Sequence, residues 1–217
     1  MSQNVIIRNL GQQNYKDIWL QMQNFTNTRN KTTDDEFWIL QHNPVFTLGQ
    51  NGKTEHLLDP KNIEVIKVDR GGQITYHGPG QLIIYTLIDL KRLKLNIRQI
   101  VTALEQSIIK LLSSLGVTAE TKCKAPGVYV NEKKICSVGL RIRRGCSFHG
   151  LALNVDMDLE PFSRINPCGY KGLEMTQVSE LDSSINMKAI SNKLVDYLID
   201  ELGYTSKHTD NLLWQEK

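Results

Sequence analysis

The segment Leu82-Ile-Ile-Tyr-Thr-Leu-Ile-Asp-Leu90 decides the fold, because it is almost continuously apolar. A strand with one face in water alternates between apolar and polar residues, whereas a strand covered on both faces reads as an unbroken apolar run. We therefore predict a central strand here, with other elements packed on both sides of its sheet. Shortly after it, Asn96 and Gln99 have the spacing of a capping box, which predicts the start of a helix.

Three segments have the periodicity of amphipathic helices. The helix after Asn96 has an apolar stripe and ends at Gly116; the stripe is Ile97, Ile100, Val101, Leu104, Ile108, Leu111, Leu112 and Leu115. An earlier helix begins at Tyr15, with Ile18, Trp19, Met22 and Phe25 on one face. A last helix runs from Met187 to Leu202 and closes at Gly203.

The remaining apolar segments are typical of strands. They are residues 5–10, 36–48 (two strands around a His-Asn-Pro turn), 63–68, 128–130 with 134–144 as a hairpin, and 148–155. Strands in the middle of the chain, with helices between and after them, predict an α/β (α+β) fold in which helices pack on a mixed β-sheet. No linker or repeat divides the chain, so residues 1–217 are predicted to form a single domain.

Composition excludes several classes of protein. The net charge is only +3, and no aromatic stacking pattern or long basic stripe is present, so we expect no nucleic-acid partner. No apolar run reaches the roughly 18 residues of a membrane span, so we expect no membrane partner. The N-terminus, Met1-Ser-Gln-Asn-Val-Ile-Ile7, lacks the features of a secretory signal, and the chain is predicted to be cytoplasmic.

One of the four cysteines stands apart from the others. Cys123, Cys136 and Cys146 are expected to be small buried hydrophobic residues. The sequence contains no C-x-x-C pair, so the spacing of the cysteines does not indicate a metal site. Cys168 lies in Asn166-Pro-Cys-Gly169, where proline fixes the backbone before it and glycine frees the backbone after it. Such a turn suits an exposed, constrained nucleophile. A packed loop cysteine is the alternative.

Lys134 is the candidate activator of that thiol. Along the strand that follows, it shares the parity of Cys136, Val138, Leu140 and Ile142, so we expect its side chain to point inward with the core face. A thiolate beside an ammonium is the reactive form of cysteine. The alternative is that Lys134 belongs to the hairpin turn with Lys133 and is solvated.

The segment from Arg70 to Gln81 is rich in glycine, which lets backbone approach a ligand closely. With its apolar flanks it would line a tunnel for a flexible alkyl chain, although a hairpin whose turns need glycine explains it equally well. His77 and His149 are candidate partners for a Cys-His dyad. Arg141, Arg143 and Arg144 alternate along a predicted strand edge, where they would meet an acidic carrier protein or simply protect the edge with charge.

Four blocks resemble those of the lipoyl(octanoyl) transferase family. They are Arg70-Gly-Gly-Gln-Ile-Thr-Tyr-His-Gly-Pro-Gly-Gln-Leu82, Lys134-Ile-Cys-Ser-Val-Gly-Leu-Arg-Ile-Arg-Arg-Gly145, Phe148-His-Gly-Leu-Ala-Leu-Asn154 and Asn166-Pro-Cys-Gly169. The resemblance implies the fold of the biotin/lipoate ligase superfamily. It also implies transfer of an octanoyl group from acyl carrier protein to a specific lysine of a lipoyl domain.

The resemblance further implies which residues do the work. Its thioester-forming cysteine corresponds to Cys168 and its activating lysine to Lys134. The implied substrate-binding residues are Arg70, Gly71, Gly72, Gln73, Ile74, Thr75, Tyr76, His77, Ser137, Val138, Gly139, Gly150, Leu151 and Ala152. The implied partners are acyl carrier protein, the lipoyl domains of 2-oxoacid dehydrogenase complexes and the glycine cleavage H protein. No cofactor or metal is implied, since the substrate arrives on the phosphopantetheine arm of the carrier.

Two other functions remain open from the sequence. An ATP-dependent lipoate or biotin protein ligase of the same superfamily would activate a free acid as an adenylate, but that chemistry needs no nucleophilic thiol. A non-catalytic module would dock carrier domains through the glycine-rich segment and the arginines.

Overall fold

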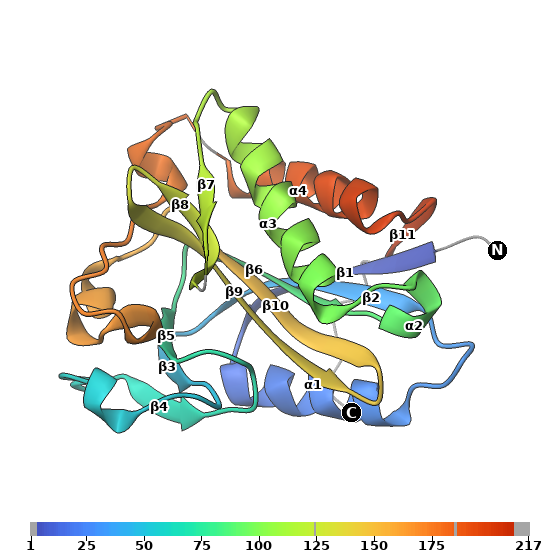
Figure 1. Ribbon diagram of the computed structural model, residues 1–217, viewed down its shortest axis with the longest axis horizontal. Coiled ribbons are helices and arrows are strands. Elements are labelled where there is room, and N and C mark those ends of the chain that lie inside the picture. The colour runs from blue at the N-terminus through green and yellow to red at the C-terminus, as the bar shows by residue number, and fades with distance from the viewer. Residues whose placement is uncertain (1–3, 124, 185, 211–217) are drawn as a thin grey trace.

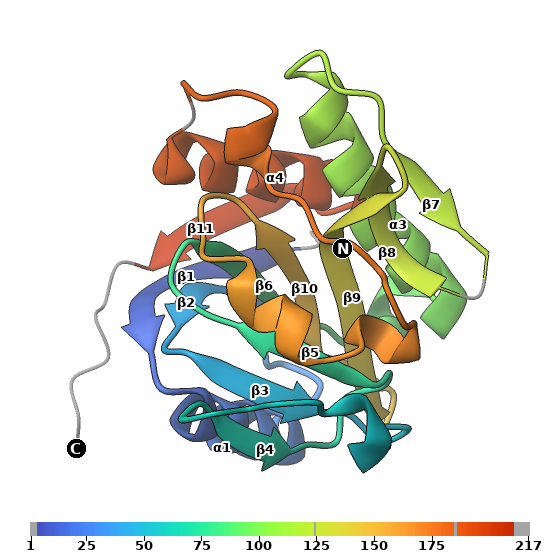
Figure 2. The ribbon, with the colours of Figure 1, turned by 90° about the vertical axis from the view of Figure 1, so that its left-hand side faces the viewer.

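The computed structural model describes residues 4–123, 125–184 and 186–210. Residues 1–3, 124, 185 and 211–217 lie outside the described residues. The prediction about the N-terminus rests partly on residues 1–3, and the single-domain prediction includes all of these residues. A main sheet has the strand order β11-β1-β2-β6-β10-β9-β8-β7, and a smaller sheet has the order β4-β3-β5. The two sheets and their helices can be followed in Figures 1 and 2.

The strands of the main sheet are β1 (Asn4–Gln13), β2 (Asp35–His42), β6 (Gln81–Leu87), β7 (Glu120–Lys122), β8 (Ala125–Val130), β9 (Lys133–Arg143), β10 (Cys146–Asn154) and β11 (Ser206–Asp210). The smaller sheet contains β3 (Val45–Leu48), β4 (Glu64–Lys67) and β5 (Ile74–His77). Parallel and antiparallel pairs coexist, since β1 is parallel to β2 whereas β6 is antiparallel to both β2 and β10. The predicted mixed sheet is confirmed.

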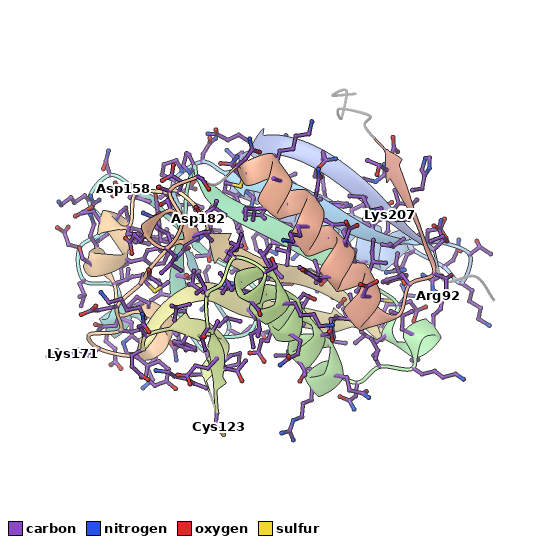
Figure 3. All side chains as sticks on the ribbon, turned by 90° about the horizontal axis from the view of Figure 1, so that it is seen from above. Arg92, Cys123, Asp158, Lys171, Asp182 and Lys207 are labelled. Carbon is purple, nitrogen blue, oxygen red and sulfur yellow. The ribbon has the colours of Figure 1, made fainter. Side chains whose placement is uncertain are left out.

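Helices cover the main sheet on both faces. Helices α3 (Ile97–Ser113) and α4 (Met187–Leu202) lie together on one face, as the view from above in Figure 3 shows. Helix α1 (Tyr15–Thr28) lies on the opposite face, near the smaller sheet (Figure 1). A short helix, α2 (Leu90–Leu93), follows β6. Among the described residues, no helix combines the length and the apolarity that crossing a membrane requires.

The central strand is buried along its whole length, as the apolar run predicts. All residues of β6 are buried; Leu82 and Ile84 face the α3–α4 cluster, while Ile83 and Tyr85 face α1. The strand ends at Leu87 rather than Leu90, because Asp89 accepts hydrogen bonds from the amides of Lys91 and Arg92 and caps α2.

The predicted helix starts and stops are confirmed with small shifts. Asn96 and Gln99 form both hydrogen bonds of a capping box at the start of α3, and α4 ends at Gly203 in the left-handed conformation. Helix α3 ends at Ser113, a little before Gly116. Strands β5, β7 and β11 were not predicted. Strand β5 lies inside the glycine-rich segment, and the sequences of β7, Glu-Thr-Lys, and β11, Ser-Lys-His-Thr-Asp, have no apolar pattern.

Candidate active site

The two predicted reactive side chains are in contact. Lys134 Nζ lies 3.0 Å from Cys168 Sγ, although the residues are 34 positions apart in the sequence. Lys134 comes from the start of β9, and Cys168 from a 3₁₀ turn, η3 (Pro167–Gly169), in the loop after β10. The geometry is that of a hydrogen-bonded ammonium and sulfur.

The turn holds Cys168 in an unusual backbone conformation. Its φ is 56° and its ψ is 15°, the left-handed region that non-glycine residues seldom adopt. Hydrogen bonds hold the turn from both sides, since Gly169 N donates to Asn166 O at 2.9 Å and Asn166 N donates to His56 O at 2.8 Å. The surrounding chain therefore holds Cys168 in a strained conformation at the cavity, as is common at functional sites.

Lys134 reaches the cysteine because of an irregularity in β9. Tyr129 of β8 pairs with Lys134, but the adjacent Val128 pairs with Cys136, so Ile135 is an extra residue. An extra residue of this kind shifts the alternation of side chains between the faces. Lys134 thus lies on the face of Tyr129, opposite to Cys136.

This arrangement corrects the argument from parity. Lys134 is buried as predicted, with 1% of its surface exposed, but it does not share the core face of Cys136 and Val138. The alternative of a solvated turn residue applies to its neighbour instead, since Lys133 is exposed and pairs with Glu174 at 2.7 Å.

The surroundings of Lys134 favour the ammonium form. Burial by itself lowers the pKa of Lys134, but the charge and hydrogen bond of Cys168, together with Tyr129, raise the pKa above its ordinary value. Pro126 O accepts a second hydrogen bond from Nζ at 2.9 Å, and the Tyr129 ring centroid lies 5.3 Å from Nζ.

The backbone of Lys134 is tied to the chain that follows Cys168. Lys134 N donates to Glu174 O at 2.9 Å, and Thr176 N donates to Lys134 O at 3.0 Å. One short parallel bridge, between Lys134 and Met175, thus joins the two segments that carry the reactive pair.

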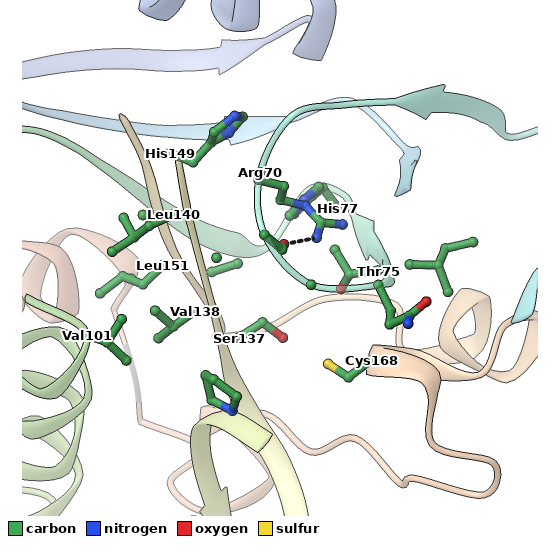
Figure 4. Close-up of a pocket in the computed structure, with 18 of the residues that line it drawn as sticks. Arg70, Thr75, His77, Val101, Ser137, Val138, Leu140, His149, Leu151 and Cys168 are labelled. Atoms are coloured by element: carbon green, nitrogen blue, oxygen red, sulfur yellow. Dashed lines mark hydrogen bonds between the residues drawn. The ribbon is translucent and has the colours of Figure 1, made fainter. Parts of the chain in front are cut away.

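A cavity of about 420 Å³ opens beside the pair, a volume in the range of small-ligand sites. Figure 4 shows Cys168 on one side of it and Val101, Leu140 and Leu151 on the other. Both reactive residues and almost all the predicted substrate-binding residues line it: Arg70, Gly71, Gly72, Gln73, Ile74, Thr75, His77, Ser137, Val138, Gly139, Gly150, Leu151 and Ala152.

Tyr76 is the exception, and its role as a substrate-binding residue stays a prediction. It is not among the residues that line the cavity. Its ring packs instead 5.5 Å from the ring of Phe46 and 5.5 Å from that of Phe162, in a separate apolar cluster. The side chains of β5 alternate, so Thr75 and His77 face the cavity side while Tyr76 turns away.

The cavity has further lining residues that the sequence analysis did not assign to it. They are Tyr15, Asn51, Ile83, Tyr85, Ile97, Val101, Ala125, Pro126, Leu140, His149 and Tyr170. The sequence places Ile97 in the apolar stripe of α3, and the structure leaves it 56% exposed. A helical apolar position that the core leaves uncovered is available to a ligand.

Neither histidine forms a dyad with the cysteine. His77 Nδ1 lies 2.7 Å from Gln81 Oε1, and His149 Nε2 lies 3.0 Å from Asp69 Oδ1. Burial lowers the pKa of His77 well below its ordinary value and also lowers that of His149. Burial thus favours the neutral form of both imidazoles, and both residues line the cavity.

Arg70 shapes the wall of the cavity. Its buried guanidinium donates to Thr47 O at 2.7 Å and to Gly71 O at 2.9 Å, the second contact being the dashed line in Figure 4. Gly71 N in turn donates to Leu140 O at 2.9 Å. Leu140 lies in the part of β9 that does not pair with β8. The glycine-rich segment is thus held against the sheet edge beside the cavity.

Arg141 and Arg143 lie along that same part of β9, whereas Arg144, predicted on the same strand edge, lies in the turn that follows β9. Arg141 donates to Gln50 Oε1 at 2.7 Å, Arg143 donates to Asn27 Oδ1 at 3.1 Å, and Arg144 donates to Asn27 O at 2.8 Å. They face α1 and the loop after β3, so their role toward a carrier protein stays a prediction.

The other cysteines differ in exposure. Cys136 and Cys146 are buried as predicted, and burial raises the pKa of Cys136 to about 12, so its thiol stays protonated. Cys123 is exposed, which corrects its prediction as a buried residue. It lies at the end of the edge strand β7, where little packs on it.

The chain resembles known proteins over most of its length. Residues 14–199 match the family described as the lipoyl protein ligase A/B catalytic domain. An octanoyltransferase of Shewanella loihica is 59% identical over 198 residues, which cover 91% of each chain.

Solved structures extend the likeness to the fold. A lipoate-protein ligase A bound with ATP has a TM-score of 0.75 at 14% identity, covering 100% of this chain and 90% of the other. A bipartite lipoate protein ligase from Thermoplasma acidophilum has a TM-score of 0.71 at 16% identity, covering 99% and 88%. The expected superfamily fold is confirmed.

Proposed function

Since this chain belongs to the lipoyl protein ligase A/B catalytic domain family and acts as an octanoyltransferase in protein lipoylation, we propose that it works through a thioester on Cys168, with Lys134 carrying the proton. The observation that supports this proposal is the 3.0 Å contact between Lys134 Nζ and Cys168 Sγ beside a cavity. A thiolate held by an ammonium is the nucleophile that acyl transfer needs.

In the first half-reaction, the Cys168 thiolate attacks the carbonyl carbon of the octanoyl thioester on acyl carrier protein. The bond from that carbon to the pantetheine sulfur breaks, and a bond to Cys168 Sγ forms. The leaving pantetheine sulfur takes a proton from the Lys134 ammonium. An octanoyl thioester on Cys168 and a neutral Lys134 amine remain.

In the second half-reaction, the amine of a lysine on the acceptor domain attacks the thioester carbon. The bond to Cys168 Sγ breaks, an amide forms, and the neutral Lys134 amine takes the proton that the attacking nitrogen loses. The thiolate and the ammonium are restored together. Two half-reactions through one covalent intermediate give ping-pong kinetics.

This scheme requires no cofactor. Exchange of one thioester for another is nearly neutral in free energy, and conversion of a thioester to an amide is favourable. We accordingly propose that transfer needs no ATP and no metal, and that the energy arrives with the carrier-bound thioester.

The cavity offers a place for the octanoyl chain. Val101 from α3, Val138 and Leu140 from β9 and Leu151 from β10 give it an apolar wall away from Cys168 (Figure 4). Burying an alkyl chain contributes about 0.8 kcal/mol for each methylene group. An acyl chain lying along this wall would hold its carbonyl carbon near the sulfur.

The partners follow from the same proposal. Acyl carrier protein donates the octanoyl group, and the acceptors are lipoyl domains, including those of 2-oxoacid dehydrogenase complexes, and the glycine cleavage H protein. We place the reaction in the cytoplasm, where thiols are kept reduced, because the mechanism needs Cys168 as a free thiol.

The proposal is tested by intact mass spectrometry of the protein after incubation with octanoyl-acyl carrier protein, without ATP. We expect one octanoyl adduct that maps to Cys168, and its disappearance when an apo lipoyl domain is added. Absence of the adduct, or full transfer by Cys168→Ala, would rule out the thioester mechanism.

The same assay separates this function from that of an ATP-dependent ligase, whose fold the chain shares. A ligase would label the apo lipoyl domain from free lipoate and ATP, and would do so without Cys168. We expect no such labelling, because the site is built around a reactive thiol.

A further inference from the structure

One peptide group connects a carboxylate to the reactive ammonium. The carbonyl of Pro126 accepts a hydrogen bond from Lys134 Nζ at 2.9 Å. The N–H of Gly127, which belongs to the same peptide group, donates to Glu105 Oε1 at 2.8 Å. Hydrogen bonds thus link Glu105 to Cys168 by way of the Pro126–Gly127 peptide group and Lys134.

The orientation of this peptide group depends on glycine. Gly127 has a φ of +131°, and a Cβ atom there would lie 2.4 Å from Cys136 O and 2.8 Å from Lys134 Cε. A side chain would therefore displace Lys134. The contact of Gly127 N–H with Glu105 lies on the opposite side of the peptide group from Lys134, where it can keep the Pro126 carbonyl directed at Nζ.

Glu105 is placed to supply that contact. It is the one acidic residue in the sequence of α3, and it lies between the buried Leu104 and Ser107 of the helix. A half-buried carboxylate that accepts from a backbone amide forms a stronger hydrogen bond than a neutral acceptor does. It also lies near enough to Lys134 for their charges to interact.

We infer that Glu105 is a positioning residue for the reaction: it fixes the Pro126–Gly127 peptide group so that the Pro126 carbonyl holds the Lys134 ammonium against Cys168. The inference deepens the proposed function, but it concerns the reactivity of the thiol, which can be measured without any acyl substrate.

The test compares the wild type, Glu105→Ala and Glu105→Gln by the pH dependence of alkylation of Cys168 with iodoacetamide, followed by peptide mass spectrometry. In Glu105→Ala the peptide loses its acceptor, so we expect alkylation at neutral pH to slow by about tenfold, as for the loss of a hydrogen bond to a charged group. The profile should also move to higher pH. Glu105→Gln keeps an oxygen acceptor and should restore most of the rate and the original profile.

Glu201→Gln is the matched control, because Glu201 of α4 pairs with Lys110 of α3 away from the thiol. It should behave like the wild type. The inference is overturned if Glu105→Ala alkylates with the wild-type rate and profile, or if Glu105→Gln is as defective as Glu105→Ala while both are folded. If Glu105→Ala does not fold, a wild-type profile in Glu105→Gln supports the inference, and a shifted one overturns it.

The alkylation result is independent of the acyl donor. If the wild type forms no octanoyl adduct but its thiol reactivity depends on Glu105 as described, the proposed substrate is wrong and the positioning role stands. If the adduct forms and alkylation does not depend on Glu105, the proposed function stands and the positioning role is wrong.

Discussion

Cys168 Sγ and Lys134 Nζ lie 3.0 Å apart, and backbone hydrogen bonds join the two chain segments that carry them. The residues after Cys168 pair with the main chain of Lys134, through Glu174 O and Thr176 N. A shift of either segment would therefore change the distance between the two reactive atoms.

Cys168→Ala should abolish the acyl adduct, and Cys168→Gly should do so while making the fold more stable than Cys168→Ala. The φ of 56° at this position costs an alanine about 1 kcal/mol more than a glycine. Urea unfolding of the two variants measures the difference. Equal stabilities would mean that the turn relaxes once the sulfur is removed.

Lys134→Met should leave the fold intact but slow octanoyl transfer by roughly 100-fold or more, the range of a lost proton-transfer group. The methionine fills most of the buried space, and the cysteine can remain a neutral thiol, so the substitution leaves no unpaired buried charge. Single-turnover acylation and circular dichroism of the same sample measure the two effects. Unchanged acylation would remove Lys134 from the mechanism.

Gly127→Ala should destabilise the protein by more than about 1 kcal/mol and slow transfer, because its Cβ would collide with Lys134 Cε. Gly116→Ala is the matched control, since Gly116 also has a positive φ, of +77°, but nothing lies within 4 Å of a Cβ there. We expect the control to lose stability and keep its rate. Loss of rate in both variants would show that backbone strain alone, and not the collision, matters.

Asp69→Asn should lower stability at neutral pH but not in strong acid. Burial by itself raises the pKa of Asp69, but hydrogen bonds from His149 and Trp19 lower it to about 2. Because the pKa is lower in the folded state than in the unfolded state, the stabilisation is complete above about pH 4 and is lost as the pH falls toward 2. The contribution is on the order of 2 kcal/mol.

Urea unfolding of the wild type and Asp69→Asn between neutral pH and pH 3 measures this contribution. The two stability curves should converge as the pH falls. A constant difference over that range would show that Asp69 acts through packing and not through its charge.

Tyr76→Phe should leave the KM for octanoyl-acyl carrier protein unchanged, because the Tyr76 ring packs with Phe46 and Phe162 outside the cavity. Val138→Phe is the comparison, since Val138 lines the cavity and a larger side chain there would occupy space for the acyl chain. Steady-state kinetics of both variants separate the two positions. A raised KM in Tyr76→Phe would show that Tyr76 contributes to substrate binding.

The sequence by itself determined the elements whose signals are local. The capping box at Asn96 and Gln99, the left-handed Gly203 after α4, and the apolar run of β6 all act through residues within one or two turns or along one strand. The turn around Cys168 belongs to this group, since proline and glycine restrict the backbone directly. The resemblance in the four blocks added the two reactive residues and the glycine-rich wall.

Only the tertiary structure decided which face each side chain takes and what it meets. The extra residue Ile135 moves Lys134 to the face of Tyr129, and no pattern in the sequence marks it, because a bulge is defined by the register with a neighbouring strand. Strand β11 likewise forms through pairing with β1, about 200 residues earlier in the chain. Burial of Tyr76, exposure of Cys123 and the contact of Glu105 with Gly127 arise in the same way, because each depends on which distant segments pack together.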